Sequence, residues 1–137
     1  EADADGNDKS WHIFPVLGRE NFLRGIPDFA VALLQKKNNR TENLLLINPV
    51  TGEHYSASRG HGAALNSRRV RTSDVKHADR AAVVSNLLDQ TRSSDDPLMW
   101  GEMASLLARD SSMFRTAGCV ALDIARVASG HLDAAVI

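Results

Sequence analysis

Histidines are the first candidates for metal ligation or proton transfer in this 137-residue sequence. Their spacing contains neither an HExxH helix motif nor a paired set of ligands, so it does not indicate a zinc site. We therefore expect each histidine to be a surface or turn residue. The serines of the central region lack the G-x-S-x-G elbow of a serine hydrolase. The residues concerned are His12, His54, His61, His77 and His131, together with Ser56, Ser58 and Ser67.

Cys119 is the single cysteine, so no intramolecular disulfide can form and no Cys/His cluster suggests structural zinc. A buried, small hydrophobic role is expected for it rather than that of a reactive thiol. The cysteine content fits a reducing compartment, and we expect a cytoplasmic location.

Cations are densest over residues 59–80, which carry a local formal charge of +4. Such a segment favours contact with RNA phosphates, whereas the formal charge of −1 for the whole chain indicates no global attraction to nucleic acid or membranes. No aromatic residue is interleaved to stack on bases, so a solvated charged face is the alternative. A weak RNA contact would involve Arg59, Arg68, Arg69 and Arg71.

Gly18 and Arg19 form a second candidate site for anions. If a helix begins here, its free N–H groups attract an anion and the guanidinium adds a bidentate contact. These two residues are therefore candidate phosphate-binding residues. The alternative is that Arg19 pairs only with Glu20 or with solvent.

The first half of the chain reads as a strand followed by an antiparallel meander over residues 27–72. Pro15 removes a backbone donor and Gly18 frees the backbone, so the first strand is expected to end near Phe14. Asn66 and Ser67 mark a turn. This first strand lies in the apolar run 11–17, and the other expected strands cover residues 29–34, 44–47, 54–58 and 63–65, with an edge segment at 68–72.

The second half is predicted to contain a strand at residues 81–85, two helices and a last strand at 132–137. Asp96 caps the first helix and Pro97 occupies its first position. Its core face is expected at Met99, Met103, Leu106 and Leu107, packed on the sheet. The second helix covers residues 119–129, with Val120, Ile124 and Val127 on one side and Gly130 as its C-terminal cap. The apolar last strand would need a partner or further polypeptide to cover it.

Length and composition bound these expectations. A hydrophobic content of 43% supports one core of ordinary size, which predicts a single domain over residues 1–137. No apolar run reaches the roughly 20 residues that span a bilayer, so no membrane association is expected. The acidic start lacks the basic flank of a signal peptide, and residues 1–10 are expected to be a solvated loop.

Three stretches resemble the inositol monophosphatase family, which includes bacterial extragenic suppressor proteins. WHIFPVLGRENF at residues 11–22 resembles the family motif W-x-I-D-P-L-D-G-T-T-N-F. NPVTGEHY at 48–55 and RGHGAALN at 59–66 resemble its meander, and RTAGCVALDIARVASGHLD at 115–133 resembles R-x-x-G-S-A-A-L-D-L-A-x-V-A-A-G-R-L-D. The resemblance implies part of a layered α/β/α/β/α fold, hence an α+β chain truncated at both ends, and Mg²⁺-dependent hydrolysis of phosphate monoesters.

The metal motif departs from this resemblance. The two aspartates that bind Mg²⁺ in the family correspond to Phe14 and Leu17, and the threonine that orients the attacking water corresponds to Arg19. Magnesium requires oxygen ligands, which phenyl and isobutyl groups lack. An upstream glutamate ligand corresponds at best to Glu1. We therefore expect no metal ligands and no cofactor.

In the third stretch, the family turn that meets the substrate corresponds to Gly118 and Cys119, with Asp123 one helical turn further on. These three residues are candidate substrate contacts. The alternative for Asp123 is a hydrogen bond or salt bridge that orients its helix.

The sequence thus predicts an inositol-monophosphatase-like protein that has lost hydrolysis, has no catalytic residues, and acts as an interaction module with a second copy or another protein. One alternative is an active inositol or sugar phosphate monoesterase whose ligands are supplied elsewhere. Another is a regulatory protein that contacts RNA, since some bacterial relatives resemble transcription factors in their associations.

Overall fold

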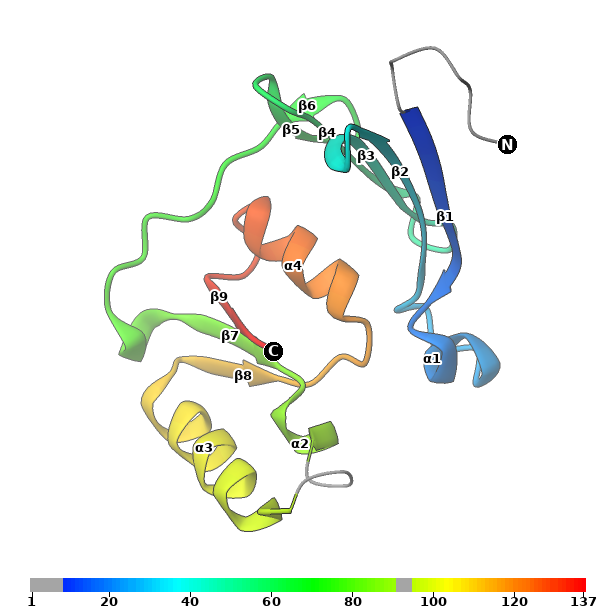
Figure 1. Cartoon of the computed structure of the whole chain (residues 1–137). Helices are drawn as coiled ribbons and strands as arrows, with labels where there is room; N and C mark the ends of the chain where they lie inside the picture. Colours follow the sequence, from blue (N-terminus) through cyan, green and yellow to red (C-terminus); the bar gives the residue numbers. More distant parts are fainter. Residues whose placement is uncertain (1–8, 91–94) are drawn as a thin grey trace. The chain divides into compact units, whose positions relative to one another are not determined.

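The computed structural model describes residues 9–90 and 95–137 (Figure 1). Two compact units divide the chain at Val70 and Arg71. Residues 1–8 of the expected N-terminal loop, with the candidate ligand Glu1, and part of the loop expected before Asp96 lie outside the described residues. The expectation that this loop extends to residue 10 was wrong, because Lys9 and Ser10 belong to the first strand and pair with Lys37 and Lys36. That the two units fold together as one domain remains a prediction.

An antiparallel sheet of six strands forms the described part of the first unit, with neighbouring strands in chain order. This arrangement confirms the meander over residues 27–72, and the first strand joins it by pairing with the second. A short helix connects these two strands. The elements are β1 (Lys9–Leu17), α1 (Arg19–Leu23), β2 (Ala30–Lys37), β3 (Arg40–Asn48), β4 (Glu53–Ser58), β5 (Gly62–Leu65) and β6 (Arg68–Arg69).

Two pairs of polar residues form the tight turns of this sheet. Asn38 and Asn39 have φ values of 50° and 59°, and Asn66 and Ser67 have φ values of 48° and 66°. Positive φ at both central residues is the geometry that keeps the right-handed twist of two flanking strands. The predicted turn at Asn66 and Ser67 is therefore confirmed, and asparagine tolerates this backbone at lower cost than most residues.

The first strand is longer than predicted. β1 continues through Pro15 to Leu17, and its pairing with β2 shifts register between Phe14 and Leu17. The expectation that it ends near Phe14 was wrong, because β1 lies at the edge of the sheet, where the missing N–H of proline breaks no central hydrogen-bond ladder.

Asn48 is a fully buried polar residue at the end of β3. Its side-chain nitrogen donates to the Pro27 carbonyl at 2.8 Å, and its oxygen accepts from the Val50 and Thr51 N–H groups at 3.0 and 3.2 Å. A buried amide that is satisfied in this way holds the turn to β4 in one conformation.

The second unit contains a sheet of three parallel strands, in the order β8, β7, β9. The chain passes from β7 through α3 to β8, and then through α4 to β9 on the other side of β7. Because both crossovers are right-handed, α3 and α4 lie on opposite faces of this sheet (Figure 1). The elements are η1 (Ala78–Arg80), β7 (Ala82–Ser85), α2 (Leu87–Gln90), α3 (Pro97–Asp110), β8 (Met113–Arg115), α4 (Val120–Ala128) and β9 (Ala134–Val136).

α3 begins as predicted but does not bury the predicted face. The Asp96 carboxylate accepts a hydrogen bond from the Met99 N–H at 3.1 Å, which confirms the cap. Met99 and Met103 are nevertheless 41% and 39% exposed, Leu106 is exposed too, and Ala104 is the buried residue of the helix. A 14-residue helix is about 21 Å long, whereas the four residues of β7 extend about 13 Å. The sheet is therefore too short to cover the whole apolar face of α3.

α4 is also confirmed as a helix, with Gly130 in a left-handed conformation just beyond its end. Leu122 and Asp123 are its buried residues, whereas Ile124, on the side that also carries Val120 and Val127, is exposed. In the described residues, no helix is long and apolar enough to cross a membrane.

Asp133 makes the stability of the second unit depend on pH. Its carboxylate accepts hydrogen bonds from the Ser73 side chain and from the Ala82 N–H at 2.6 Å, and these bonds lower the pKa of Asp133 below its ordinary value of 3.8. The resulting stabilisation is complete above that ordinary value and is lost as the pH falls through the lower pKa of the folded state.

We expect Asp133→Asn to flatten the decline in unfolding free energy below about pH 4, because an amide keeps the acceptor but carries no titrating charge. Urea denaturation at a series of pH values measures this decline. Asp79→Asn, at an exposed position of the same unit, serves as the control for replacing one carboxylate by an amide. An equal flattening in both variants would contradict the assignment.

Candidate functional site

Phe14 and Leu17 lie at the C-terminal end of β1, on either side of its register shift. Phe14 is 42% exposed and Leu17 is half-buried opposite Ala30. Neither side chain has an atom that can ligate a cation. Among the described residues, no three His, Cys, Asp or Glu side chains converge in a way that could hold a metal ion. The donor groups of this segment therefore do not fit Mg²⁺, which requires several oxygen ligands in octahedral order.

Gly18 and Arg19 follow directly. Gly18 adopts a left-handed conformation, with φ 82° and ψ 46°, and its carbonyl accepts from the Phe22 N–H at 3.1 Å. The Arg19 guanidinium donates to the Glu20 carboxylate at 3.3 Å, and both side chains are largely exposed. This is the pairing that we gave as the alternative to phosphate binding. Because exposed pairs of this kind contribute only about 0–1 kcal/mol, an anion could still compete for Arg19.

Gly118, Cys119 and Asp123 lie together at the start of α4 in the second unit. Gly118 has φ 79°, and Cys119 precedes the helix with its side chain almost completely buried, as predicted for a packing cysteine. Asp123 is also buried, and its carboxylate lies 3.9 Å from the Arg126 guanidinium one turn later. Both residues belong to α4, so this ion pair lies within the helix, and substrate contact by Gly118, Cys119 and Asp123 stays a prediction.

The basic residues of the central segment are divided between the units. In the first unit, Arg59 pairs with Glu42 at 3.4 Å, and Arg69 donates to the His61 carbonyl at 3.4 Å. Arg69 borders an open cavity of about 360 Å³ above β4 and β5. Arg68 belongs to the same unit and Arg71 begins the second. The five histidines are all exposed, as expected.

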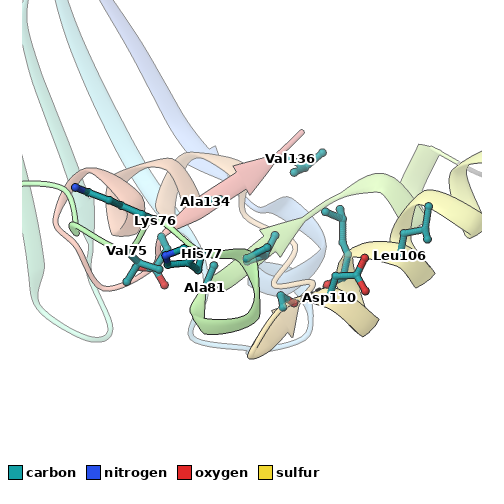
Figure 2. A pocket seen from close by; sticks show the side chains of 13 residues that line it. Val75, Lys76, His77, Ala81, Leu106, Asp110, Ala134 and Val136 are labelled. Atoms are coloured by element: carbon teal, nitrogen blue, oxygen red, sulfur yellow. Dashed lines mark hydrogen bonds between the residues drawn. The ribbon is translucent and has the colours of Figure 1, made fainter.

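A cavity in the second unit was not predicted from the sequence. It has a volume of about 430 Å³ and lies between α3 and the strands β7 and β9 (Figure 2). Its walls are mainly apolar and include Val83, Leu106 and Val136. The apolar face of α3 was the available sequence signal for this cavity. Leu106 and Leu107 of that face become part of the cavity wall only when β7 and β9 are in place.

Two carboxylates border this cavity, and both have hydrogen-bond donors. Arg109 holds Asp110 through bonds of 2.7 and 3.0 Å, which lower the pKa of Asp110, and Asp133 is bonded as described above. Lys76 and His77 also line the cavity, and Figure 2 shows them with Val75 beside Ala81. The cavity therefore suits an apolar group more than catalysis by an unpaired acid or base.

Comparison with known proteins gives the family context. The model of the inositol monophosphatase family matches residues 1–137. The chain is 37% identical over 134 residues to the Nus factor SuhB of Pseudomonas aeruginosa, covering 98% of this chain and 49% of that protein. It is 30% identical over 133 residues to the Nus factor SuhB of Escherichia coli, covering 97% and 49%.

Solved structures agree with these sequence matches. The extragenic suppressor protein suhB of Bartonella henselae superposes with a TM-score of 0.80 at 28% identity, over 91% of this chain and 48% of that one. Inositol monophosphatase from Anabaena also gives a TM-score of 0.80, at 25% identity, over 94% and 50%. The chain spans about half the length of these relatives. The α+β fold class is thereby confirmed, and the chain belongs to the inositol monophosphatase family.

Proposed function

We propose that this chain is an inositol monophosphatase family member that does not hydrolyse phosphate monoesters with Mg²⁺ and serves as an interaction module. The observation that carries the proposal is the pair Phe14 and Leu17, which stand where the family motif has aspartates. A phenyl and an isobutyl group cannot neutralise charge on a leaving phosphate oxygen or lower the pKa of a bound water, which are the tasks of the metal.

The neighbouring residues support the same proposal. Arg19 replaces a water-orienting threonine and pairs with Glu20, so this position does not direct a nucleophile. Gly18 and Arg19 are proposed as the contacts of any phosphorylated ligand, and Gly118, Cys119 and Asp123 as further ligand contacts. Hydrolysis of that ligand is not expected.

A phosphate-release assay with inositol phosphates and sugar phosphates tests the proposal. With Mg²⁺ present, we expect the rate to equal that of a sample containing EDTA, because no described carboxylate cluster holds the metal. Metal-dependent turnover above about 1 s⁻¹, an ordinary enzymatic rate, would overturn the proposal and favour an active monoesterase whose ligands come from elsewhere.

The partner is proposed to be a protein, either a second copy or a component related to transcription, in the cytoplasm. Relatives with 30–37% identity that bear the name Nus factor support this choice. RNA is the second candidate partner, because residues 59–70 contain three arginines and no acidic residue.

Salt dependence separates these two candidate partners. If Arg59, Arg68, Arg69 and Arg71 each neutralise one phosphate of a single strand, the logarithm of the RNA affinity should fall with the logarithm of salt concentration with a slope of about 3. RNA binding that is absent, or insensitive to salt, leaves the protein partner as the proposal.

A further inference from the structure

The second unit begins with a segment that belongs to neither a helix nor a strand. It covers residues 71–77, between β6 and η1, and we call it the connecting segment. Every residue of it is exposed except Ser73, which is half-buried. An enzyme can therefore bind this segment in an extended conformation without first unfolding a helix or a strand.

Ser73 attaches the connecting segment to the rest of the unit. Its hydroxyl donates a hydrogen bond to the Asp133 carboxylate, which also accepts from the Ala82 N–H at 2.6 Å, at the start of β7. The backbone packs closely here too. A Cβ atom on Gly130 would lie 2.9 Å from the Arg71 carbonyl oxygen and 3.4 Å from the Ser73 nitrogen. One side-chain hydrogen bond and one close backbone approach thus hold the segment against the turn between α4 and β9.

The hydrogen bond from Ser73 to Asp133 depends on the hydroxyl proton. The pKa of Asp133 is lowered, so its carboxylate is ionised at neutral pH and only accepts hydrogen bonds. A phosphate ester on Ser73 has no proton on the bridging oxygen, and it carries a charge of about −1.5 to −2 at pH 7. This charge would lie beside the charge of Asp133. Repulsion between the two groups therefore favours a segment that has moved away from Asp133.

Three arginines precede Ser73 in the sequence. Arg71, Arg69 and Arg68 lie two, four and five residues before it, and all three side chains are exposed. Guanidinium groups pair with carboxylates through bidentate hydrogen bonds. Kinases use such charge patterns to select their substrates. The sequence before Ser73 therefore suits a kinase whose peptide-binding groove is acidic.

We propose that Ser73 is a phosphorylation site for an arginine-directed serine kinase, and that phosphorylation releases the connecting segment from Asp133. The γ-phosphoryl group of ATP is transferred to the Ser73 Oγ. The bond from its phosphorus to the β-phosphate oxygen breaks, a bond from phosphorus to Oγ forms, the hydroxyl proton passes to a base of the kinase, and ADP leaves. This inference goes beyond the proposed function, and it holds whether or not the chain hydrolyses phosphate monoesters.

The modification is tested with the catalytic subunit of cyclic-AMP-dependent protein kinase, ATP and Mg²⁺, and the modified residue is mapped by tandem mass spectrometry. We expect one phosphate on Ser73, which Thr72→Val retains and Ser73→Ala abolishes. Arg71→Gln should slow the reaction about tenfold, because it removes a charge-assisted contact to the kinase. Arg40→Gln, at an exposed arginine at the start of β3, is the matched control and should leave the rate unchanged. No incorporation, or incorporation on Thr72 alone, would overturn the proposal.

The release is tested by the rate at which trypsin cleaves after Lys76, because cleavage of a folded chain reports local opening. Phosphorylation of Ser73 should raise this rate about tenfold or more. Ser73→Ala removes only the hydrogen bond and should raise it about threefold. Cleavage after Lys37, at the turn between β2 and β3, is the internal control and should not change. Equal rates before and after phosphorylation would overturn the release.

The Asp133→Asn background separates charge repulsion from loss of the hydrogen bond. Ser73→Glu should accelerate cleavage after Lys76 more than Ser73→Ala does when Asp133 is present. In the Asp133→Asn background the two substitutions should differ less than about twofold, because the repelling carboxylate is gone. An undiminished effect of Ser73→Glu in that background would overturn the role of Asp133. The phosphate-release assay is independent of these results, so either proposal can fail while the other stands.

Discussion

Replacing Gly130 by alanine is expected to lower the unfolding free energy by about 2–5 kcal/mol, the sum of a left-handed backbone cost and of overpacking. Gly130 has φ +76°, a conformation that disfavours any side chain. A Cβ atom there would also lie 2.9 Å from the Arg71 carbonyl oxygen and 3.4 Å from the Ser73 nitrogen. Because these are backbone atoms, the segment at residues 71–73 would have to move.

Gly52→Ala is the matched control for this prediction. Gly52 has nearly the same φ, +73°, but a Cβ atom there would meet nothing within 4 Å. Its substitution should therefore cost only the backbone term of about 1–2 kcal/mol. Urea denaturation followed by circular dichroism measures both variants. Equal losses would show that the close approach of residues 71–73 to Gly130 does not constrain the second unit.

Leu122→Ala is expected to destabilise the chain by about 2–5 kcal/mol, since Leu122 is fully buried and truncation removes apolar contacts and leaves a cavity. Ile124→Ala, two residues later on the same helix, should cost about 1 kcal/mol or less because Ile124 is exposed. The same denaturation experiment compares them. A larger loss for Ile124→Ala would show that the side of α4 carrying Val120, Ile124 and Val127 is the buried one.

Local chemistry predicted the parts of the fold that depend on nearby residues. The turns at Asn38 and Asn66 follow from backbone conformations that these residues tolerate, and the start of α3 follows from the carboxylate of Asp96. Each of these features requires only a few consecutive residues, so the sequence is sufficient to identify it.

Long-range packing decided the parts that the sequence did not predict. The three-residue strand β8 is too short for a periodic signal, and its parallel pairing with β7 depends on the crossover through α3. The buried face of α3 was misassigned for a related reason. Helical periodicity shows which residues share a side, but the extent of the sheet determines which side is buried.

The candidate site also has features that the local sequence predicted and features that depend on long-range packing. The sequence placed Phe14 and Leu17 near the end of a strand, and the structure adds the register shift between them. The sequence also gave the two alternatives for Arg19, and the structure shows the pairing with Glu20. The cavity beside α3 was not evident from the sequence, because it requires several elements to be brought together.

The central claim is that Phe14 and Leu17 do not allow a divalent cation to bind where the family motif has aspartates. Paramagnetic broadening by Mn²⁺ in a ¹⁵N–¹H spectrum of the chain tests this claim most directly. Mn²⁺ takes the oxygen ligands that Mg²⁺ takes and broadens the amide signals nearest to it. Phe14 and Leu17 supply no such ligand. We therefore predict that Mn²⁺ does not selectively broaden the amide signals of residues 13–19, and that excess Mg²⁺ does not change these signals. Selective, Mg²⁺-reversible broadening of those amides would contradict the account.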